Sequence, residues 1–217
     1  MASQTNTPAS VLNQGSGDLS WVIDRKGAGR VELYANDQLS QSLTLTKFGF
    51  RIPPTAIITG VAVSLSRRAQ HAETTNRILD AGVRLTLNGR SFAGSTQAEK
   101  ATQWPSEKSE WIQYGHSSDL WGLTLSPSDV NSPNFGVGIQ AQCTSSGAEG
   151  NSVATVYPVS VTVYFTIPVA TPAMLLSDPD PSSGAPGSTP LPKGTPDCGC
   201  DGTTPPSPIG PFELGAF

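Results

Sequence analysis

The composition of this chain changes sharply near residue 170. Residues 21–168 carry the alternating apolar and polar side chains that are typical of β-strands, whereas 171–217 hold 11 of the 19 prolines and almost no apolar run. A segment of the second kind cannot bury enough apolar surface to fold alone. We therefore expect three parts: a polar N-terminal lead at 1–20, one β-sandwich domain at 21–168, and an extended proline-rich C-terminal arm at 169–217.

The alternation before residue 170 has a period of two and predicts half-buried strands. It is clearest at 61–65, 81–87, 135–143 and 159–167, and weaker strands are expected at 21–24, 30–34, 111–114 and 153–157. Successive side chains of a strand point to opposite faces, and one apolar face per strand is typical of antiparallel sheets. We predict an all-β fold, an antiparallel β-sandwich that is jelly-roll-like, with an immunoglobulin-like Greek key as the alternative. The last strand, 153–167, is long and apolar and is expected in the centre of its sheet.

Two local features interrupt this pattern. Leu43 and Leu45 share one parity while Phe48 and Phe50 share the other, which predicts a β-bulge near Thr46-Lys47. A one-turn helix is expected after Ser126, where a capping serine is followed by Pro127 and, three residues on, by Asp129.

Charge and cysteine content exclude several classes of function. The arm has five acidic residues against Lys193, so it carries the whole net charge of −4 and leaves the body with 12 acids and 12 bases. A neutral body argues against nucleic-acid binding, and the adjacent pair Arg67-Arg68 is interpreted as a solvated strand end. We expect no transmembrane helix and no secretory signal, because no apolar stretch of the required length is present.

The three cysteines do not form a metal or disulfide pattern. Cys198 and Cys200 have no companion pair at zinc spacing, and Cys143 continues the apolar phase of its strand. We therefore expect no metal, no cofactor and a buried Cys143.

Several short motifs occur in order along the body. Phe48-Gly49-Phe50-Arg51-Ile52-Pro53 is followed by Ile58-Thr59-Gly60-Val61 and Trp104-Pro105. Further on come Tyr114-Gly115, Asp119-Leu120-Trp121-Gly122, Asp129-Val130-Asn131 and Asn134-Phe135-Gly136-Val137. In these motifs, over roughly 20–167, the chain resembles a group of poorly characterised virion-associated proteins of tailed bacteriophages.

The resemblance implies a structural protein of the phage particle, made in the bacterial host cytoplasm and located in the virion, and it carries no catalytic residue. Cement or decoration of the capsid is one role of such modules, and we interpret the chain as a cement protein rather than an enzyme. The partners would be the major capsid protein or other virion proteins, and a homo-oligomer, dimer or trimer, is expected. The alternative is a carbohydrate- or receptor-binding module of a tail fibre, neck or baseplate.

The physical interpretation of these motifs is structural. We expect Trp121 to anchor a loop against the end of the sandwich with a partner for its indole N–H, and Asp119 to accept hydrogen bonds that fix this loop. Phe48 and Phe135 are expected in the core.

The end of the arm regains apolar residues that suit pockets on a partner. They are Ile209, Phe212, Leu214 and Phe217. We therefore expect the arm to run across neighbouring subunits and to attach through these four side chains.

Two further sets of residues offer alternatives. Trp104, Trp111, Tyr114 and Trp121 lie close together in the sequence and are candidates for stacking on a sugar ring, with core and interface packing as the competing interpretation. His116, Ser117, Ser118 and Asp119 contain the residue types of a hydrolase triad, but side chains so close in sequence rarely reach the relay geometry. Asp80, Glu110 and Asp119 are acids that a sandwich could bring together.

Overall fold

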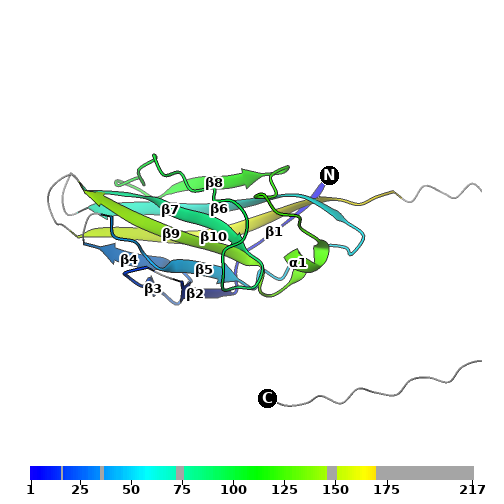
Figure 1. Ribbon diagram of the computed structural model, residues 1–217, viewed down its shortest axis with the longest axis horizontal. Helices are drawn as coiled ribbons and strands as arrows, with labels where there is room; N and C mark the ends of the chain where they lie inside the picture. The colour runs from blue at the N-terminus through cyan, green and yellow to red at the C-terminus, as the bar shows by residue number, and fades with distance from the viewer. Residues whose placement is uncertain (16, 35–36, 72–75, 146–150, 170–217) are drawn as a thin grey trace, which may run out of the picture. The chain divides into compact units, whose positions relative to one another are not determined.

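The computed structural model describes residues 1–15, 17–34, 37–71, 76–145 and 151–169, which form two antiparallel β-sheets packed face to face (Figure 1). The first sheet runs in the spatial order β3 (Val22–Ile23), β4 (Gly29–Leu33), β10 (Ser152–Thr166), β6 (Ile57–His71) and β8 (Glu110–His116), with β1 (Ala2–Asn6) paired to β10. The second sheet runs β2 (Ser10–Gln14), β5 (Ser42–Thr46), β9 (Gly136–Ser145) and β7 (Asn76–Thr86). The predicted antiparallel β-sandwich is confirmed.

The order in which successive strands enter the two sheets is that of a jelly roll. From β4 to β10, consecutive strands alternate between the two sheets, so each connection crosses from one layer to the other. An immunoglobulin-like Greek key would instead join several neighbouring strands of one sheet directly. The jelly-roll-like arrangement is therefore the one observed.

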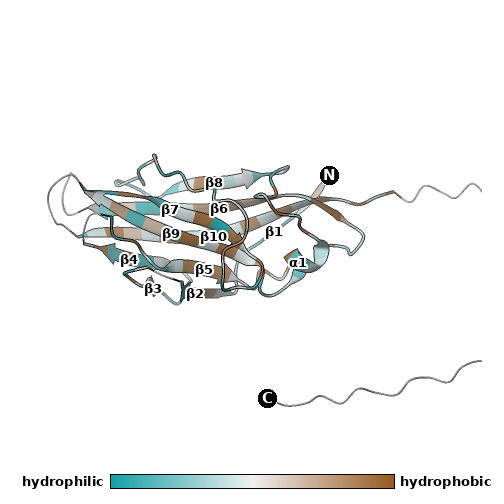
Figure 2. Ribbon diagram, viewed as in Figure 1, coloured by the Kyte–Doolittle hydropathy of each residue, from teal (hydrophilic) through white to brown (hydrophobic). Residues whose placement is uncertain are grey.

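The longest strand pair forms the centre of the first sheet. β10 pairs with β6 from Ser152↔His71 to Thr166↔Ile57, and its other edge pairs with β4 and β1. Val159, Val161 and Val163 of β10 are buried, as the alternation predicts, and Figure 2 shows hydrophobic and hydrophilic residues alternating along strands such as β9. The predicted central position of the last strand is confirmed.

The N-terminal residues correct the predicted domain boundary. Residues 1–20 were expected to form a lead outside the sandwich, but they supply β1 and β2. β1 is polar because it lies at a sheet edge, where main-chain hydrogen bonds to β10, from Ala2↔Phe165 to Asn6↔Val161, hold it without an apolar face. A search for alternating apolar residues cannot detect such a strand.

The predicted bulge at Thr46-Lys47 is wrong. β5 ends at Thr46, and Lys47 takes a left-handed backbone conformation with φ of 60° that turns the chain out of the sheet. The turn brings Phe48 and Phe50 into the core, with their ring centroids 5.9 Å apart.

A register shift occurs instead in β7, between Asp80 and Gly82. Ile78 and Asp80 are buried before it, and Val83 and Leu85 after it. Because the shift changes the parity of the strand, Asp80 enters the interior and Ala81, expected on the face of Val83, is only half-buried.

The predicted one-turn helix is confirmed as α1 (Pro127–Asn131). The Ser126 hydroxyl accepts a hydrogen bond from the Asp129 N–H, and the Asp129 carboxylate accepts one from the Ser126 N–H at 2.9 Å. Two hydrogen bonds to the Asp129 carboxylate lower its pKa, first the one from the Ser126 hydroxyl at 2.6 Å and second the one from the Ser126 N–H. Among the residues described, no helix has the length and hydrophobicity to span a bilayer.

The chain divides into two units, Met1–Thr171 and Pro172–Phe217. The second unit lies outside the described residues. The proposed anchors Ile209, Phe212, Leu214 and Phe217, and the cysteines Cys198 and Cys200, lie there too.

Candidate functional site

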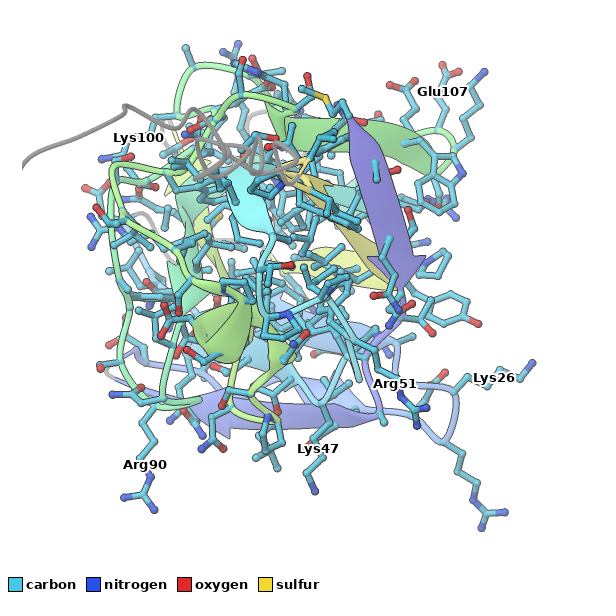
Figure 3. The ribbon with its side chains drawn as sticks, turned by 90° about the vertical axis from the view of Figure 1, so that its right-hand side faces the viewer. Lys26, Lys47, Arg51, Arg90, Lys100 and Glu107 are labelled. Carbon is cyan, nitrogen blue, oxygen red and sulfur yellow. The ribbon has the colours of Figure 1, made fainter. Side chains whose placement is uncertain are left out.

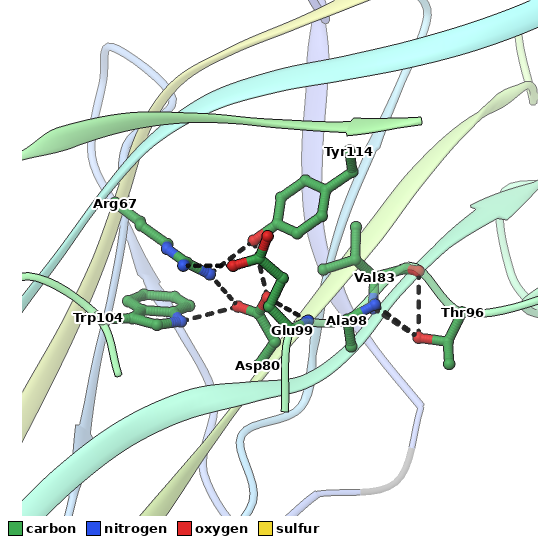
Figure 4. A network of polar contacts seen from close by, with 8 residues as sticks. All are labelled: Arg67, Asp80, Val83, Thr96, Ala98, Glu99, Trp104 and Tyr114. Carbon is green, nitrogen blue, oxygen red and sulfur yellow. Dashed lines mark hydrogen bonds and ion pairs between the residues drawn. The ribbon is translucent and has the colours of Figure 1, made fainter. Parts of the chain in front are cut away.

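A buried cluster of charged and aromatic side chains lies between the two sheets (Figure 4). Asp80 of β7 stands at its centre and accepts hydrogen bonds at Oδ1 from Arg67 Nη1 (2.8 Å) and Trp104 Nε1 (2.7 Å). Its Oδ2 accepts from the Tyr114 hydroxyl (2.9 Å) and from the Glu99 N–H (2.9 Å). The carboxylate therefore has four donors and no free lone pair directed at solvent.

Arg67 of β6 completes the cluster. It is 4% exposed, donates to Asp80 and the Tyr114 hydroxyl, and contacts Glu99 at 3.3 Å. Its guanidinium carbon lies 5.6 Å from the centroid of the Trp104 ring and 6.0 Å from that of Tyr114. The predicted solvated strand end is therefore wrong for Arg67, which continues the inward parity of Val63 and Leu65.

The cluster joins the two layers rather than exposing a reactive group. Arg67 and Tyr114 come from the first sheet, Asp80 from the second, and Trp104 and Glu99 from the connection between β7 and β8. Burial, and secondly the Asp80 carboxylate, raise the pKa of Tyr114 well above its ordinary value, so its hydroxyl remains a donor. Because Arg67 and Asp80 are each other's buried charge partner, removing either one would leave the other uncompensated in the interior.

The connection that carries Trp104 also covers the outer edge of β7. The N–H groups of Ala93, Gln97 and Trp104 donate to the carbonyls of Leu85, Val83 and Ile78, respectively, at 2.8–2.9 Å. Three carbonyls on this edge of β7 are therefore paired, which leaves less of the edge free to associate with another strand.

The Tyr114–Gly122 motif builds a fixed loop at one end of the sandwich. The Trp121 indole donates to the Val61 carbonyl at 2.8 Å, and the Asp119 carboxylate accepts from the Trp121 N–H (2.7 Å) and the Gln97 amide (2.9 Å). Gly115 has φ of 68°, and a Cβ there would collide with the Val61 carbonyl oxygen. The predicted roles of Trp121 as an anchor and of Asp119 as a loop-fixing acceptor are confirmed.

The segment 48–53 and the helix α1 are joined by two hydrogen bonds to one side-chain amide. Asn131, at the end of α1, accepts from the Ile52 N–H and donates to the Ile52 carbonyl, both at 2.8 Å. Phe50 in the same segment contacts the Phe135 ring edge-on, with centroids 6.0 Å apart. Phe48 and Phe135 are both in the core, as predicted. The short motifs of the sequence thus form part of the framework of the sandwich.

The aromatic residues proposed to stack on sugars are not on one surface. Trp104, Tyr114 and Trp121 are 1%, 3% and 0% exposed, and only Trp111, at 64%, faces solvent. Three of the four candidates therefore pack inside the protein and are unable to stack on a ligand. The competing interpretation, core packing, is therefore correct for these three residues. Trp111 and Tyr114 lie on opposite faces of β8, which explains why Trp111 alone of the four is exposed.

The residues His116, Ser117, Ser118 and Asp119 are not arranged as a hydrolase triad. The Ser118 hydroxyl lies 3.1 Å from His116 Nδ1, but the Asp119 carboxylate is bonded to Trp121 and Gln97 instead of the imidazole. In the described part of the chain no three His, Cys, Asp or Glu residues are grouped so as to hold a metal ion. Cys143 is buried as expected, and burial raises its thiol pKa.

Cavities open at several places on the surface of the described sandwich, and two of them are lined in part by an arginine. One, of about 380 Å³, is lined by Leu19, Ser20, Val22, Arg30, Glu32 and Tyr34. Its charges are paired with each other: Arg30 contacts Glu32 at 2.7 Å, and the Tyr34 hydroxyl donates to Glu32 at 2.8 Å, which lowers the pKa of Glu32. The other, of about 280 Å³, lies on the outer face of the second sheet.

No family model matches the sequence, and a search of curated proteins gives no match. Among solved structures, a protein described under "CBM4 structure and function" is similar at 12% identity and a TM-score of 0.35, over 72% of this chain and 92% of that chain. The CBM22-1 xylan-binding domain of Paenibacillus barcinonensis Xyn10C gives 11% identity and a TM-score of 0.33, over 77% and 95%.

The baseplate tripod of bacteriophage Tuc2009 gives 14% identity and a TM-score of 0.30, over 80% of this chain and 65% of that chain. TM-scores and identities this low carry no argument about function.

Proposed function

We propose that this chain is a structural protein of a tailed-bacteriophage particle, most specifically a cement protein that decorates the capsid. The observation that carries the proposal is that the motifs shared with phage virion proteins are the residues that build the sandwich. Trp121 and Asp119 fix the loop at the end of the sandwich, and the Asn131 side chain bonds to the backbone of Ile52. The position of these motifs in the folded framework supports the proposal.

The C-terminal arm supplies the second part of the proposal. Its 11 prolines and its glycines and serines favour an extended backbone of about 3.1 Å per residue, so it reaches on the order of 100 Å or more. Such a reach spans a neighbouring subunit. Binding through the body and through the apolar side chains at 209–217 would add avidity without requiring any single strong contact.

In this role the body contacts the shell and the arm crosses to adjacent copies of the major capsid protein or of this chain. The result would be reinforcement of the shell against internal pressure. A dimer or trimer of this chain suits the symmetry axes of such a shell.

The experiment compares three proteins for binding to phage particles that lack this protein. They are the full chain, a variant without 171–217, and a variant with alanine at Ile209, Phe212, Leu214 and Phe217. A matched control carries alanine at Cys198 and Cys200, in the same arm but outside the apolar anchors.

We expect both arm variants to lose at least about tenfold in co-sedimentation with particles and to leave the particles more heat-sensitive, because avidity is lost. The control should behave as the full chain does. Equal association and equal particle stability for all four proteins would refute the proposal.

A carbohydrate- or receptor-binding module of a tail fibre, neck or baseplate is the second candidate. The cavity on the outer face of the second sheet favours it, because hydroxyl groups, an arginine and an aromatic ring line this cavity together.

A further inference from the structure

The outer face of the second sheet carries a polar groove of about 280 Å³. Its floor comes from β5 and β9, where Thr44 pairs with Gly138 on the side opposite the core residues Leu43 and Leu45. The lining comprises Gly15, Ser42, Thr44, Thr86, Arg90, Ser91, Phe92, Gly138 and Gln140. This volume is at the lower limit of small-molecule sites, which span about 300–1,000 Å³.

One wall of the groove depends on a glycine in β9, because the space above Gly138 is taken by the Phe92 ring. A Cβ at Gly138 would collide with the Phe92 ring and would lie 2.6 Å from the Ser42 hydroxyl. The Phe92 ring therefore rests on the backbone of β9, and the Arg84 guanidinium lies 5.8 Å from its centroid. Phe92 forms an apolar wall beside a floor of hydroxyl groups.

The loop that forms this wall is fixed before any ligand binds. The Asn88 side-chain oxygen accepts hydrogen bonds from the N–H groups of Arg90 and Ser91, both at 2.9 Å. The Asn88 amide also donates to the Ser91 hydroxyl at 2.8 Å. Because the loop is already ordered, binding would cost little conformational entropy there.

The chemistry of the lining favours an anionic, hydroxylated ligand. Hydroxyl groups of Ser42, Thr44, Thr86 and Ser91 line the groove, and Ser91 is the exposed one of the four. No carboxylate lines the groove within the described ranges. The ion pairs found among those residues involve Arg30 and Arg67, so the Arg90 guanidinium has no carboxylate partner there. This distinguishes the groove from the larger cavity, where Arg30 is already paired with Glu32.

We propose that this groove binds an acidic saccharide, a sugar unit that carries a carboxylate. Arg90 binds the carboxylate, the hydroxyls of the floor bind the ring hydroxyls, and the Phe92 ring packs against the apolar C–H groups of the sugar. The proposal goes beyond a role in particle structure, since it would let a decorated particle attach to an acidic polysaccharide surface.

The test uses the full chain on an array of immobilised uronate-containing, sialate-containing and neutral oligosaccharides, followed by titration of the strongest binder. Arg90→Gln is the test variant. Arg51→Gln is its matched control, because both arginines extend from the body into solvent (Figure 3). Trp111→Ala tests the exposed tryptophan of β8 as a rival site.

We expect acidic saccharides to bind above neutral ones, and Arg90→Gln to weaken the binding by about tenfold or more through loss of a charge-assisted hydrogen bond. Arg51→Gln and Trp111→Ala should bind as the native chain does.

Any of four results would overturn the proposal: no preference for acidic saccharides, unchanged affinity in Arg90→Gln, loss of binding in Trp111→Ala, or equally tight binding of a polyaspartate peptide. None of these results depends on the arm, so the proposal and the cement role fail separately.

Discussion

Replacing Asp80 by asparagine removes the one carboxylate that pairs with Arg67 inside the sandwich. The asparagine side chain would keep an oxygen for Arg67 and Trp104 but would place an NH₂ group where the Glu99 N–H and the Tyr114 hydroxyl now donate. The only carboxylate left to pair with Arg67 would be that of Glu99, which is 3.3 Å away and 43% exposed. Loss of one partner of a buried ion pair costs about 3–5 kcal/mol.

We therefore expect Asp80→Asn to lower the free energy of unfolding by at least about 3 kcal/mol. For a chain of this size that corresponds to roughly 6–12 °C in the melting temperature. Urea unfolding of the full chain, followed by tryptophan fluorescence, measures this change. Glu110→Gln is the control; it removes an exposed carboxylate of β8 and should change the free energy by less than about 0.5 kcal/mol.

A double variant, Arg67→Met with Asp80→Leu, separates the energy of the Arg67–Asp80 interaction from the effects of replacing each side chain alone. Because neither partner is left alone, its destabilisation should be smaller than the sum of the two single changes. A cost below about 1 kcal/mol for Asp80→Asn, or strict additivity in the double variant, would refute the claim that this cluster holds the sheets together.

Two other positions give independent tests of the framework by the same unfolding measurement. Gly115→Ala should lower the free energy of unfolding by about 2 kcal/mol more than Gly49→Ala does. Both glycines have positive φ, but only at Gly115 would a Cβ collide with the backbone. Equal losses of stability in the two variants would contradict this close contact. Ser126→Ala should cost about 1 kcal/mol through loss of the helix cap. The lowered pKa of Asp129 means that its contribution is fully present above about pH 4 and is lost as the pH falls through its folded value, so Asp129→Asn should flatten the acid limb of the stability curve. An unchanged acid limb would contradict that assignment.

The sequence predicts those parts of the fold in which one face of a strand is buried. The alternation along β10 and β9 is a direct result of that burial. The capping residues of α1, Ser126 and Asp129, lie three residues apart, so their interaction is visible in the local sequence. By contrast, β1 is held by backbone hydrogen bonds to a strand more than 150 residues away. No side-chain pattern reports such pairing.

The sites were harder to predict because they depend on distant partners. Arg67 resembles any exposed arginine until Asp80 of the other sheet is placed beside it. The one indication in the sequence is that Arg67 continues the alternation of Val63 and Leu65, which places its side chain on the inward face of β6. The groove depends on the register of β5 against β9 and on the loop at 88–92, neither of which leaves a local mark in the sequence.

The measurement that most directly tests the proposed role is a high-resolution cryo-electron microscopy map of the particles made by a phage that encodes this chain. The account predicts the sandwich on the capsid surface, with density for Phe212 and Phe217 inside pockets of a neighbouring subunit. Density for these residues packed against their own sandwich, or particles that lack the chain altogether, would contradict it.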